Sequence, residues 1–156
     1  MSSNYTVAAI DCGTNSIRLL IASAGPDGRL VEQARDLELV RLGQGVDATG
    51  SFHPDALERT FSACRTFAKT ISDHHCDQVR FVSTSAARDV SNRDDFFTGV
   101  RDALDVDAEI IDGTEEASLS FAGAMSGVQV TDEPVLVIDC GGGSTELVLG
   151  LSLIHI

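Results

Sequence analysis

Residues 10–22, IDCGTNSIRLLIA, contain an apolar run that ends in an aspartate, a polar turn that begins with a glycine, and a second apolar run. Residues 138–150, IDCGGGSTELVLG, repeat this arrangement. A shift of 128 positions aligns the identical residues, namely Asp11 with Asp139, Cys12 with Cys140, Gly13 with Gly141, Ser16 with Ser144 and Leu19 with Leu147. Each segment predicts two strands joined by a tight turn, so we expect the same hairpin twice.

The composition of these turns allows two explanations. A hairpin needs glycine for its backbone, and aspartate commonly accepts hydrogen bonds from turn amides, so each copy alone has a structural explanation. A glycine-rich turn also offers free N–H groups to an anion, and an aspartate beside it can hold a hydrated divalent cation. The second copy favours the functional explanation, because two facing hairpins would bind a phosphate and its magnesium ion from both sides.

The overall composition indicates a globular protein without nucleic-acid or membrane partners. With 156 residues, 43% of them hydrophobic, the chain is long enough to form one core of ordinary size. Its 24 acidic and 11 basic residues give a net charge of −13, and no dense run of Lys or Arg offers a face to nucleic acid. The first residues lack the pattern of a cleavable leader, and no apolar run has membrane-spanning length, so we expect a cytoplasmic protein.

Hydrophobic periodicity between the two repeats predicts alternating strands and helices. A helix is expected to begin at Pro54, because Leu57, Phe61, Cys64, Ala68 and Ile71 follow at helical spacing. Two further helices are expected at 91–104, capped by Ser91, and at 113–128. Strands are expected at 7–12, 17–24, 29–43 (which could be partly helical), 78–85, 108–112, 135–140 (as a buried strand) and 145–150. This order predicts an α/β fold with a mixed sheet.

The two repeats resemble the first and second phosphate motifs of the superfamily of acetate and sugar kinases, Hsp70 chaperones and actin. Three other segments resemble the exopolyphosphatase and guanosine pentaphosphate phosphohydrolase (Ppx/GppA) family more narrowly: RLGQGVDATGSFHPDALERT (41–60), VSTSAARDVSNRDDF (82–96) and IDGTEEASLSFAG (111–123). The resemblance runs from Val7 to Gly150. It implies Mg²⁺-dependent hydrolysis of the terminal phosphate of inorganic polyphosphate or the 5′ phosphate of pppGpp, by a full-length protein that is a homodimer.

The resemblance also implies how the chain is divided. Residues 5–126 would form a ribonuclease-H-like (actin-like ATPase) lobe with a mixed five-stranded sheet, and residues 127–150 the first hairpin of a truncated second lobe. The ending LSLIHI (151–156) is one translation of CTGTCTCTTATACACATC, a common transposase sequencing adaptor, so we expect this tail not to be native. The chain is therefore expected to be an inactive fragment with exposed apolar strand edges.

The resemblance assigns phosphate binding to both turns and to one arginine. The turn residues are Gly13, Thr14, Asn15, Ser16, Gly141, Gly142, Gly143, Ser144 and Thr145. Arg88 matches a phosphate-binding arginine of the family, and a guanidinium is suited to bidentate phosphate contacts. A surface ion pair with Asp89 or Asp94 explains Arg88 equally well. Arg18 is a weaker candidate, because Ile17 and Leu19 beside it indicate an ordinary strand residue.

Four acidic residues are the candidates for catalysis and metal binding. The resemblance assigns Asp11, Asp139 and Glu146 to Mg²⁺, and Glu116 and Glu146 to catalysis, with Glu116 as the general base that activates water. The alternative is structural: acids favour the positive end of a helix, and Glu146 could be a solvent-facing strand residue. Glu115, three residues after Asp112, already fits a capping-box-like pair.

Other features have simpler explanations. The cluster DHHCD (73–77) closes a helix, where histidine is favourable, so we do not expect a metal site there. The cysteines show no CxxC spacing and are expected to be reduced, with Cys12 and Cys140 as small buried residues. Two rival functions remain open: a sugar or acid kinase of the same superfamily, and a non-catalytic nucleotide-binding switch or scaffold.

Overall fold

The computed structural model describes residues 5–25, 29–88, 90–128 and 133–151. Five strands form one mixed sheet: β1 (Thr6–Cys12), β2 (Ser16–Ala24), β3 (Leu30–Leu39), β4 (Gln78–Ser83) and β5 (Ala108–Ile110). Their order in the sheet is β3-β2-β1-β4-β5. Strand β2 pairs antiparallel with both β1 and β3, whereas β4 pairs parallel with both β1 and β5. The predicted α/β fold with a mixed five-stranded sheet is confirmed. Among the described residues, no helix is long and apolar enough to span a membrane.

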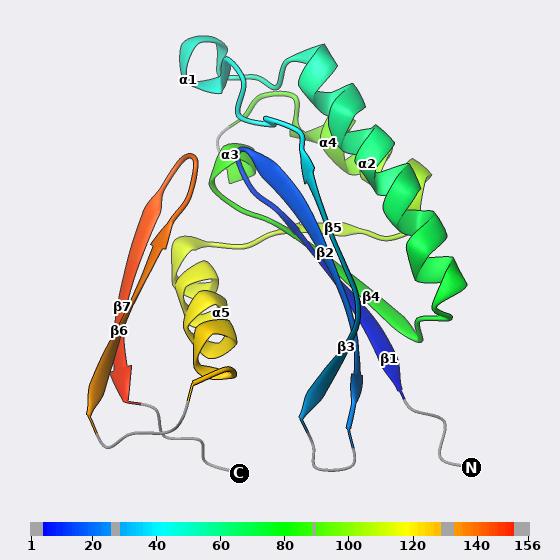
Figure 1. Cartoon of the computed structure of the whole chain (residues 1–156). Coiled ribbons are helices and arrows are strands. Elements are labelled where there is room, and N and C mark those ends of the chain that lie inside the picture. The colour runs from blue at the N-terminus through cyan, green and yellow to red at the C-terminus, as the bar shows by residue number, and fades with distance from the viewer. Residues whose placement is uncertain (1–4, 26–28, 89, 129–132, 152–156) are drawn as a thin grey trace.

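Two helices cover one face of this sheet (Figure 1): α2 (Pro54–Asp73) and α4 (Arg93–Leu104). Helix α2 begins at Pro54 as predicted, and the His53 ring accepts a hydrogen bond from the amide of Asp55 at 3.1 Å. It ends in the predicted histidine-containing segment, where the ring Nδ1 of His74 lies 2.9 Å from the carbonyl oxygen of Thr70. The helical spacing of its apolar residues therefore identified a core-facing helix correctly.

The start of α4 differs from the prediction. Its N-cap is Asn92 rather than Ser91. The Asn92 side chain accepts a hydrogen bond from the amide of Phe52 at 2.8 Å and donates one to the Phe52 carbonyl at 3.1 Å. The Asn92 side chain is fixed by this distant loop and makes no capping hydrogen bond to its own helix, which is why a local capping rule failed here.

Other segments differ in extent. The strand expected at 29–43 contains no helix but ends at Leu39. The strands expected at 78–85 and 108–112 end at Ser83 and Ile110. Two helices of four residues, α1 (Val46–Thr49) and α3 (Ser85–Arg88), were not predicted. Arg88 therefore ends a short helix after β4 instead of following the strand directly.

The second repeat forms a separate two-stranded sheet of β6 (Pro134–Cys140) and β7 (Thr145–Leu151). Helix α5 (Gly113–Met125) lies between this hairpin and the five-stranded sheet (Figure 1). The prediction that β6 is buried is wrong: its outward side chains are exposed, as are those of β7, namely Leu136, Ile138, Cys140, Leu147 and Leu149. Within the described chain no further layer covers them, so an apolar run alone did not determine burial. Residues 152–156 of the expected non-native tail lie outside the described residues.

The core between the sheet and helices α2 and α4 contains a group of aromatic rings. Phe96 has no exposed surface, and its ring lies 5.5 Å from that of Phe52 and 6.0 Å from that of Phe81, centroid to centroid. Phe52 precedes α2 and Phe81 lies on β4, so Phe96 joins three segments that are distant in sequence. The position of the loops above the sheet depends on this packing.

We expect Phe96→Ala to lower the free energy of unfolding by about 3–5 kcal/mol, because the cavity left in a close-packed core cannot fully collapse. Urea denaturation followed by circular dichroism would measure the change. Leu37→Ala on β3, where the side chain is 54% exposed, is the control and should change stability by no more than about 0.5 kcal/mol. Equal effects of the two substitutions would contradict this account of the core.

Candidate functional site

The two repeated hairpins close in the same way. In the first, the amide of Gly13 donates to the carbonyl of Ser16 at 2.9 Å, and in the second the amide of Gly141 donates to the carbonyl of Ser144 at 2.9 Å. The strand registers also correspond, because Asp11 is opposite Arg18 and Asp139 is opposite Glu146. The predicted duplication of strand, aspartate, turn and strand is therefore confirmed, and equivalent positions carry an arginine in one copy and a glutamate in the other.

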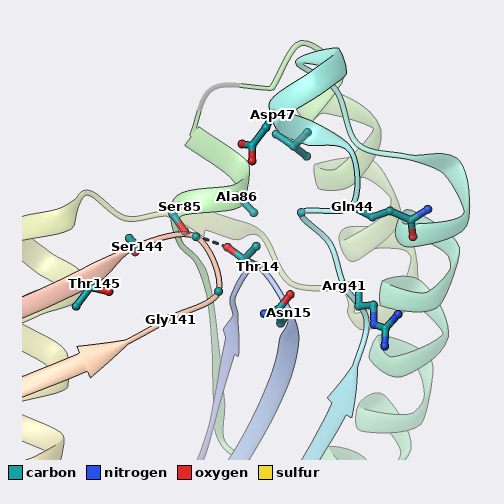
Figure 2. A pocket seen from close by; sticks show the side chains of 14 residues that line it. Thr14, Asn15, Arg41, Gln44, Asp47, Ser85, Ala86, Gly141, Ser144 and Thr145 are labelled. Carbon is teal, nitrogen blue, oxygen red and sulfur yellow. Dashed lines mark hydrogen bonds between the residues drawn. The ribbon is translucent and has the colours of Figure 1, made fainter.

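The two turns touch each other at glycine. A Cβ atom added to Gly142 would lie 2.2 Å from the side-chain nitrogen of Asn15, and one added to Gly143 would lie 2.6 Å from Thr14 Oγ1. The Thr14 hydroxyl is itself 3.1 Å from the hydroxyl of Ser85 at the start of α3 (Figure 2). The turns can approach this closely because residues 142 and 143 have no side chains.

An acidic pocket of about 240 Å³ lies beside the joined turns. Asp11, Glu116, Asp139 and Glu146 all line it, together with Arg18. Asp11 and Asp139 come from equivalent ends of β1 and β6, and Glu116 comes from the first turn of α5. The structure thus brings all four acidic candidates to one cavity.

Burial is the main cause of a raised pKa at Asp11. Partial burial and the nearby charge of Asp139 raise its pKa, and Arg18, 3.8 Å away, opposes that shift in part. A carboxyl group with a raised pKa is one whose ionised form lacks sufficient compensation. A bound cation would supply that compensation, so the pocket has the character of a cation site.

Arg88 and Glu116 form an ion pair at the wall of the pocket. Both side chains are largely buried, and the Arg88 Nε also donates to the carbonyl of Ile111 at 3.1 Å. Arg88 thus has a defined partner in Glu116, which sequence reasoning did not foresee when it considered Asp89 or Asp94. Asp94 is not the partner in this structure, and Asp89 lies outside the described residues.

The neighbouring glutamate has a different environment. Glu115 is 2.9 Å from Arg80 on the surface, and Asp112 caps α5 by accepting hydrogen bonds from the amides of Thr114 and Glu115, both at 2.9 Å. The Asp112 half of the expected capping-box-like pair is present, whereas the Glu115 side chain pairs with Arg80. Of the two glutamates, Glu116 is the one that lines the acidic pocket.

The acidic residues fit a magnesium ion that is bound partly through water and substrate. Among the described residues, no three His, Cys, Asp or Glu side chains are grouped closely enough to hold a metal ion by themselves. Mg²⁺ characteristically uses one or two carboxylates, and water and phosphate oxygens complete its octahedron. Asp11 and Asp139 suit this donor set. Asp139 is held in place by the Ser120 hydroxyl at 2.5 Å.

An outer pocket of about 730 Å³ lies next to the acidic pocket and shares the turn residues with it (Figure 2). The predicted phosphate-binding residues divide between the two cavities. Those on the acidic pocket are Gly13 and Ser16, those on the outer pocket are Gly143 and Thr145, and those on both are Thr14, Asn15, Gly141, Gly142 and Ser144. Arg88 lines neither cavity and reaches the site through Glu116.

Sequence reasoning missed Ser85, Ser120 and Arg41. Ser120 is four residues after Glu116, so helical spacing alone could have placed both on one face of α5. Ser85 and Arg41 belong to segments that were read as strand, and local sequence gave no signal for their positions.

Comparisons with known proteins agree with this architecture. The family model described as the Ppx/GppA phosphatase family matches residues 22–153. Exopolyphosphatase 2 of Mycobacterium tuberculosis is 53% identical over 152 residues, which cover 92% of this chain and 48% of the relative. The chain therefore spans about half the length of this curated relative.

Solved structures give the same result. The crystal structure of an exopolyphosphatase-like protein is 52% identical with a TM-score of 0.89, covering 96% of this chain and 46% of the other. An exopolyphosphatase from Cytophaga hutchinsonii is 31% identical with a TM-score of 0.88, covering 94% of this chain and 47% of the other. The five-stranded sheet, α5 and the second hairpin thus follow the actin-like ATPase fold.

We expect Gly143→Ala to separate the two turns, because the added methyl would collide with the Thr14 hydroxyl and approach Ser85 Oγ to 3.0 Å. Calorimetric titration of the complete protein with Mg²⁺ and polyphosphate should show about a tenfold or greater loss of affinity. Gly127→Ala is the control, because its added Cβ would meet no atom within 4 Å. Unchanged affinity in Gly143→Ala would show that contact between the turns is not needed for binding.

We expect Asp11→Asn to raise the melting temperature near neutral pH. The raised pKa of Asp11 means that ionisation of this residue costs stability as the pH rises through that pKa, and asparagine avoids the cost. The difference from wild type should vanish below about pH 3, where the carboxyl is protonated in both folded and unfolded states. Thermal denaturation over a pH series would measure it.

The same variant tests the cation site. Mg²⁺ should raise the melting temperature of the wild type but not of Asp11→Asn, because a ligand stabilises a fold only when it binds it. Asp36→Asn on β3, an exposed acid away from the pocket, should respond to Mg²⁺ like the wild type. A response of Asp11→Asn equal to that of the wild type would remove Asp11 from the metal site.

Proposed function

Because this chain belongs to the Ppx/GppA phosphatase family, we propose that the protein containing it hydrolyses the terminal phosphoanhydride of inorganic polyphosphate. The observation that carries the proposal is the meeting of two glycine turns beside four carboxylates in one cavity. The turns suit an anion and the carboxylates suit a cation. A phosphoanhydride substrate is an anion that carries a bound divalent cation, so it would match both.

In the proposed reaction Glu116 is the general base. A water molecule loses a proton to the Glu116 carboxylate as its oxygen attacks the terminal phosphorus. The bond from phosphorus to the bridging oxygen breaks, and its electron pair stays with the shortened chain. Glu146, on the strand opposite Asp139, lies at the same cavity and is proposed to help position the water.

The rest of the site would bind and orient the phosphoryl group. Turn amides at residues 13–16 and 141–145 are the proposed donors to its oxygens, as expected for positioning catalysis of phosphoryl transfer. Arg88 is proposed to leave Glu116 and donate to the phosphate when substrate enters, which would free Glu116 for water. The ion pair seen here would then be the resting arrangement.

Mg²⁺ is proposed as the cofactor, held by Asp11 and Asp139 with Glu146 nearby. It would neutralise negative charge on the phosphate oxygens. This role agrees with the burial that raises the pKa of Asp11, because a bound cation would favour the ionised form of that carboxyl group.

Several finer points are part of the proposal. The second candidate substrate is pppGpp, which also presents a terminal phosphoryl group, and the full-length protein is proposed to be a homodimer.

A cytoplasmic location is also part of the proposal. It is supported by the four cysteines, which are free thiols in this structure, namely Cys12, Cys64, Cys76 and Cys140.

We expect Glu116→Gln to lower the rate of phosphate release about 10²- to 10⁴-fold, the usual effect of losing a general base. Glu115→Gln is the matched control: it removes the adjacent carboxylate, which faces Arg80 at the surface, and should leave turnover within a few-fold of wild type. Release from polyphosphate and from pppGpp, each with Mg²⁺, would be measured on the complete protein.

The alternatives give distinct results. If the wild type bound both substrates but released no phosphate, the result would favour a nucleotide-binding switch over a hydrolase. Phosphoryl transfer to a sugar or acid hydroxyl instead of water would favour a kinase. Loss of activity in both glutamate variants would point to a structural role for the start of α5.

A further inference from the structure

The charges of the two pockets differ. The acidic pocket contains four carboxylates against Arg18. Among the described residues that line the outer pocket, the charged side chains are Arg41 and Asp47. A chain of phosphates whose end lies in the acidic pocket would be repelled there without a cation, whereas the outer pocket is balanced and larger. The phosphoryl groups beyond the reacting one would therefore meet less repulsion in the outer pocket.

Arg41 has an unusual backbone for its place in the chain. Its φ is +50°, in the left-handed region that non-glycine residues seldom adopt. Two other non-glycine residues in the described chain share this feature, His75 and Asp105, and both immediately end helices, where it is common. Arg41 instead follows β3. A strained conformation away from a helix end calls for a local cause.

That cause is the first phosphate turn. The carbonyl oxygen of Asn15 accepts hydrogen bonds from the amides of Val40, at 3.1 Å, and Arg41, at 2.9 Å. The amide of Gly43 donates to the carbonyl of Thr14 at 2.9 Å. Arg41 is thus fixed directly to the backbone of the turn that is proposed to bind phosphate.

A second arginine supports this loop from the side. The Arg59 guanidinium donates to the carbonyl of Val40 at 2.8 Å and to the side-chain oxygen of Gln44 at 2.8 Å. These two hydrogen bonds connect helix α2 to residues 40–44 and hold that segment in place. Arg41 lies between Val40 and Gln44, the two residues that Arg59 contacts.

The Arg41 guanidinium itself makes no hydrogen bond or ion pair to any described residue, unlike Arg18, Arg59 and Arg88. Figure 2 shows Arg41 and Gln44 at the edge of the outer pocket farthest from the Gly141 turn, with the Thr14–Ser85 contact between and both side chains extending away from that turn. The Arg41 backbone is therefore fixed, and among the described residues its guanidinium has no partner at the edge of the outer pocket.

We propose that the outer pocket binds the phosphoryl groups behind the one being cleaved, and that Arg41 contacts them and sets the affinity for long polyphosphate. This inference rests on the proposed function. Guanidinium pairs with phosphate through two parallel hydrogen bonds, and the Asp47 carboxylate, which also lines the outer pocket, would repel such an anion. Arg41 and Asp47 should therefore have opposite effects on binding.

The test measures binding separately from turnover. In a Glu116→Gln background, which retains the substrate, we expect Arg41→Gln to weaken binding of long-chain polyphosphate about tenfold and binding of tripolyphosphate less. Asp47→Asn should tighten binding of the long chain. The slope of log affinity against log salt should fall by about one in Arg41→Gln, because one cation contact to a polyelectrolyte is lost.

Arg65→Gln is the control, since Arg65 pairs with Glu58 on the exposed side of α2 and should leave affinity and salt slope unchanged. Unchanged long-chain affinity and salt slope in Arg41→Gln, with normal binding by the parent, would overturn this inference alone. An equal loss for both chain lengths would also overturn it, because Arg41 would then serve the terminal phosphate. If the parent binds neither polyphosphate, the proposed function fails as well.

Discussion

The site depends on the absence of side chains where the two hairpin turns meet. Gly142 and Gly143 lie so close to the side chains of Asn15 and Thr14 that an added methyl group would overlap those side chains as they stand. Their contact limits how near Asp11 and Asp139 can lie, because each aspartate is the second-last residue of the strand that leads into its turn. A steric constraint on two backbone segments thereby sets the electrostatics of the pocket.

Those electrostatics explain why an acidic protein can suit an anionic substrate. The net charge of −13 describes the whole chain, whereas a phosphate meets only the turn amides, nearby arginines and any cation held by the carboxylates. Burial raises the pKa of Asp11 in the absence of such a cation. The ionised form of Asp11 is therefore disfavoured in the fold, and a bound cation would offset that cost.

Sequence was sufficient for features that repeat or have a regular period. The duplicated hairpins and their aspartates were predicted because identical residues recur at one spacing, and helix α2 because its apolar residues follow the helical period. Burial of Cys140 was predicted wrongly, because burial depends on what packs against a strand. The roles of Asn92 and Arg41 were not predictable, since a loop 40 residues away fixes Asn92 and the first turn fixes Arg41.

The opposite charges at equivalent positions of the two hairpins have a further consequence. Polyphosphate reads the same from either end, and two identical hairpins facing each other would accept it in either direction. Arg18 in one copy and Glu146 in the other make the two halves of the site unequal. A phosphate chain without polarity of its own would therefore meet a cation on one side of the acidic pocket and a carboxylate on the other.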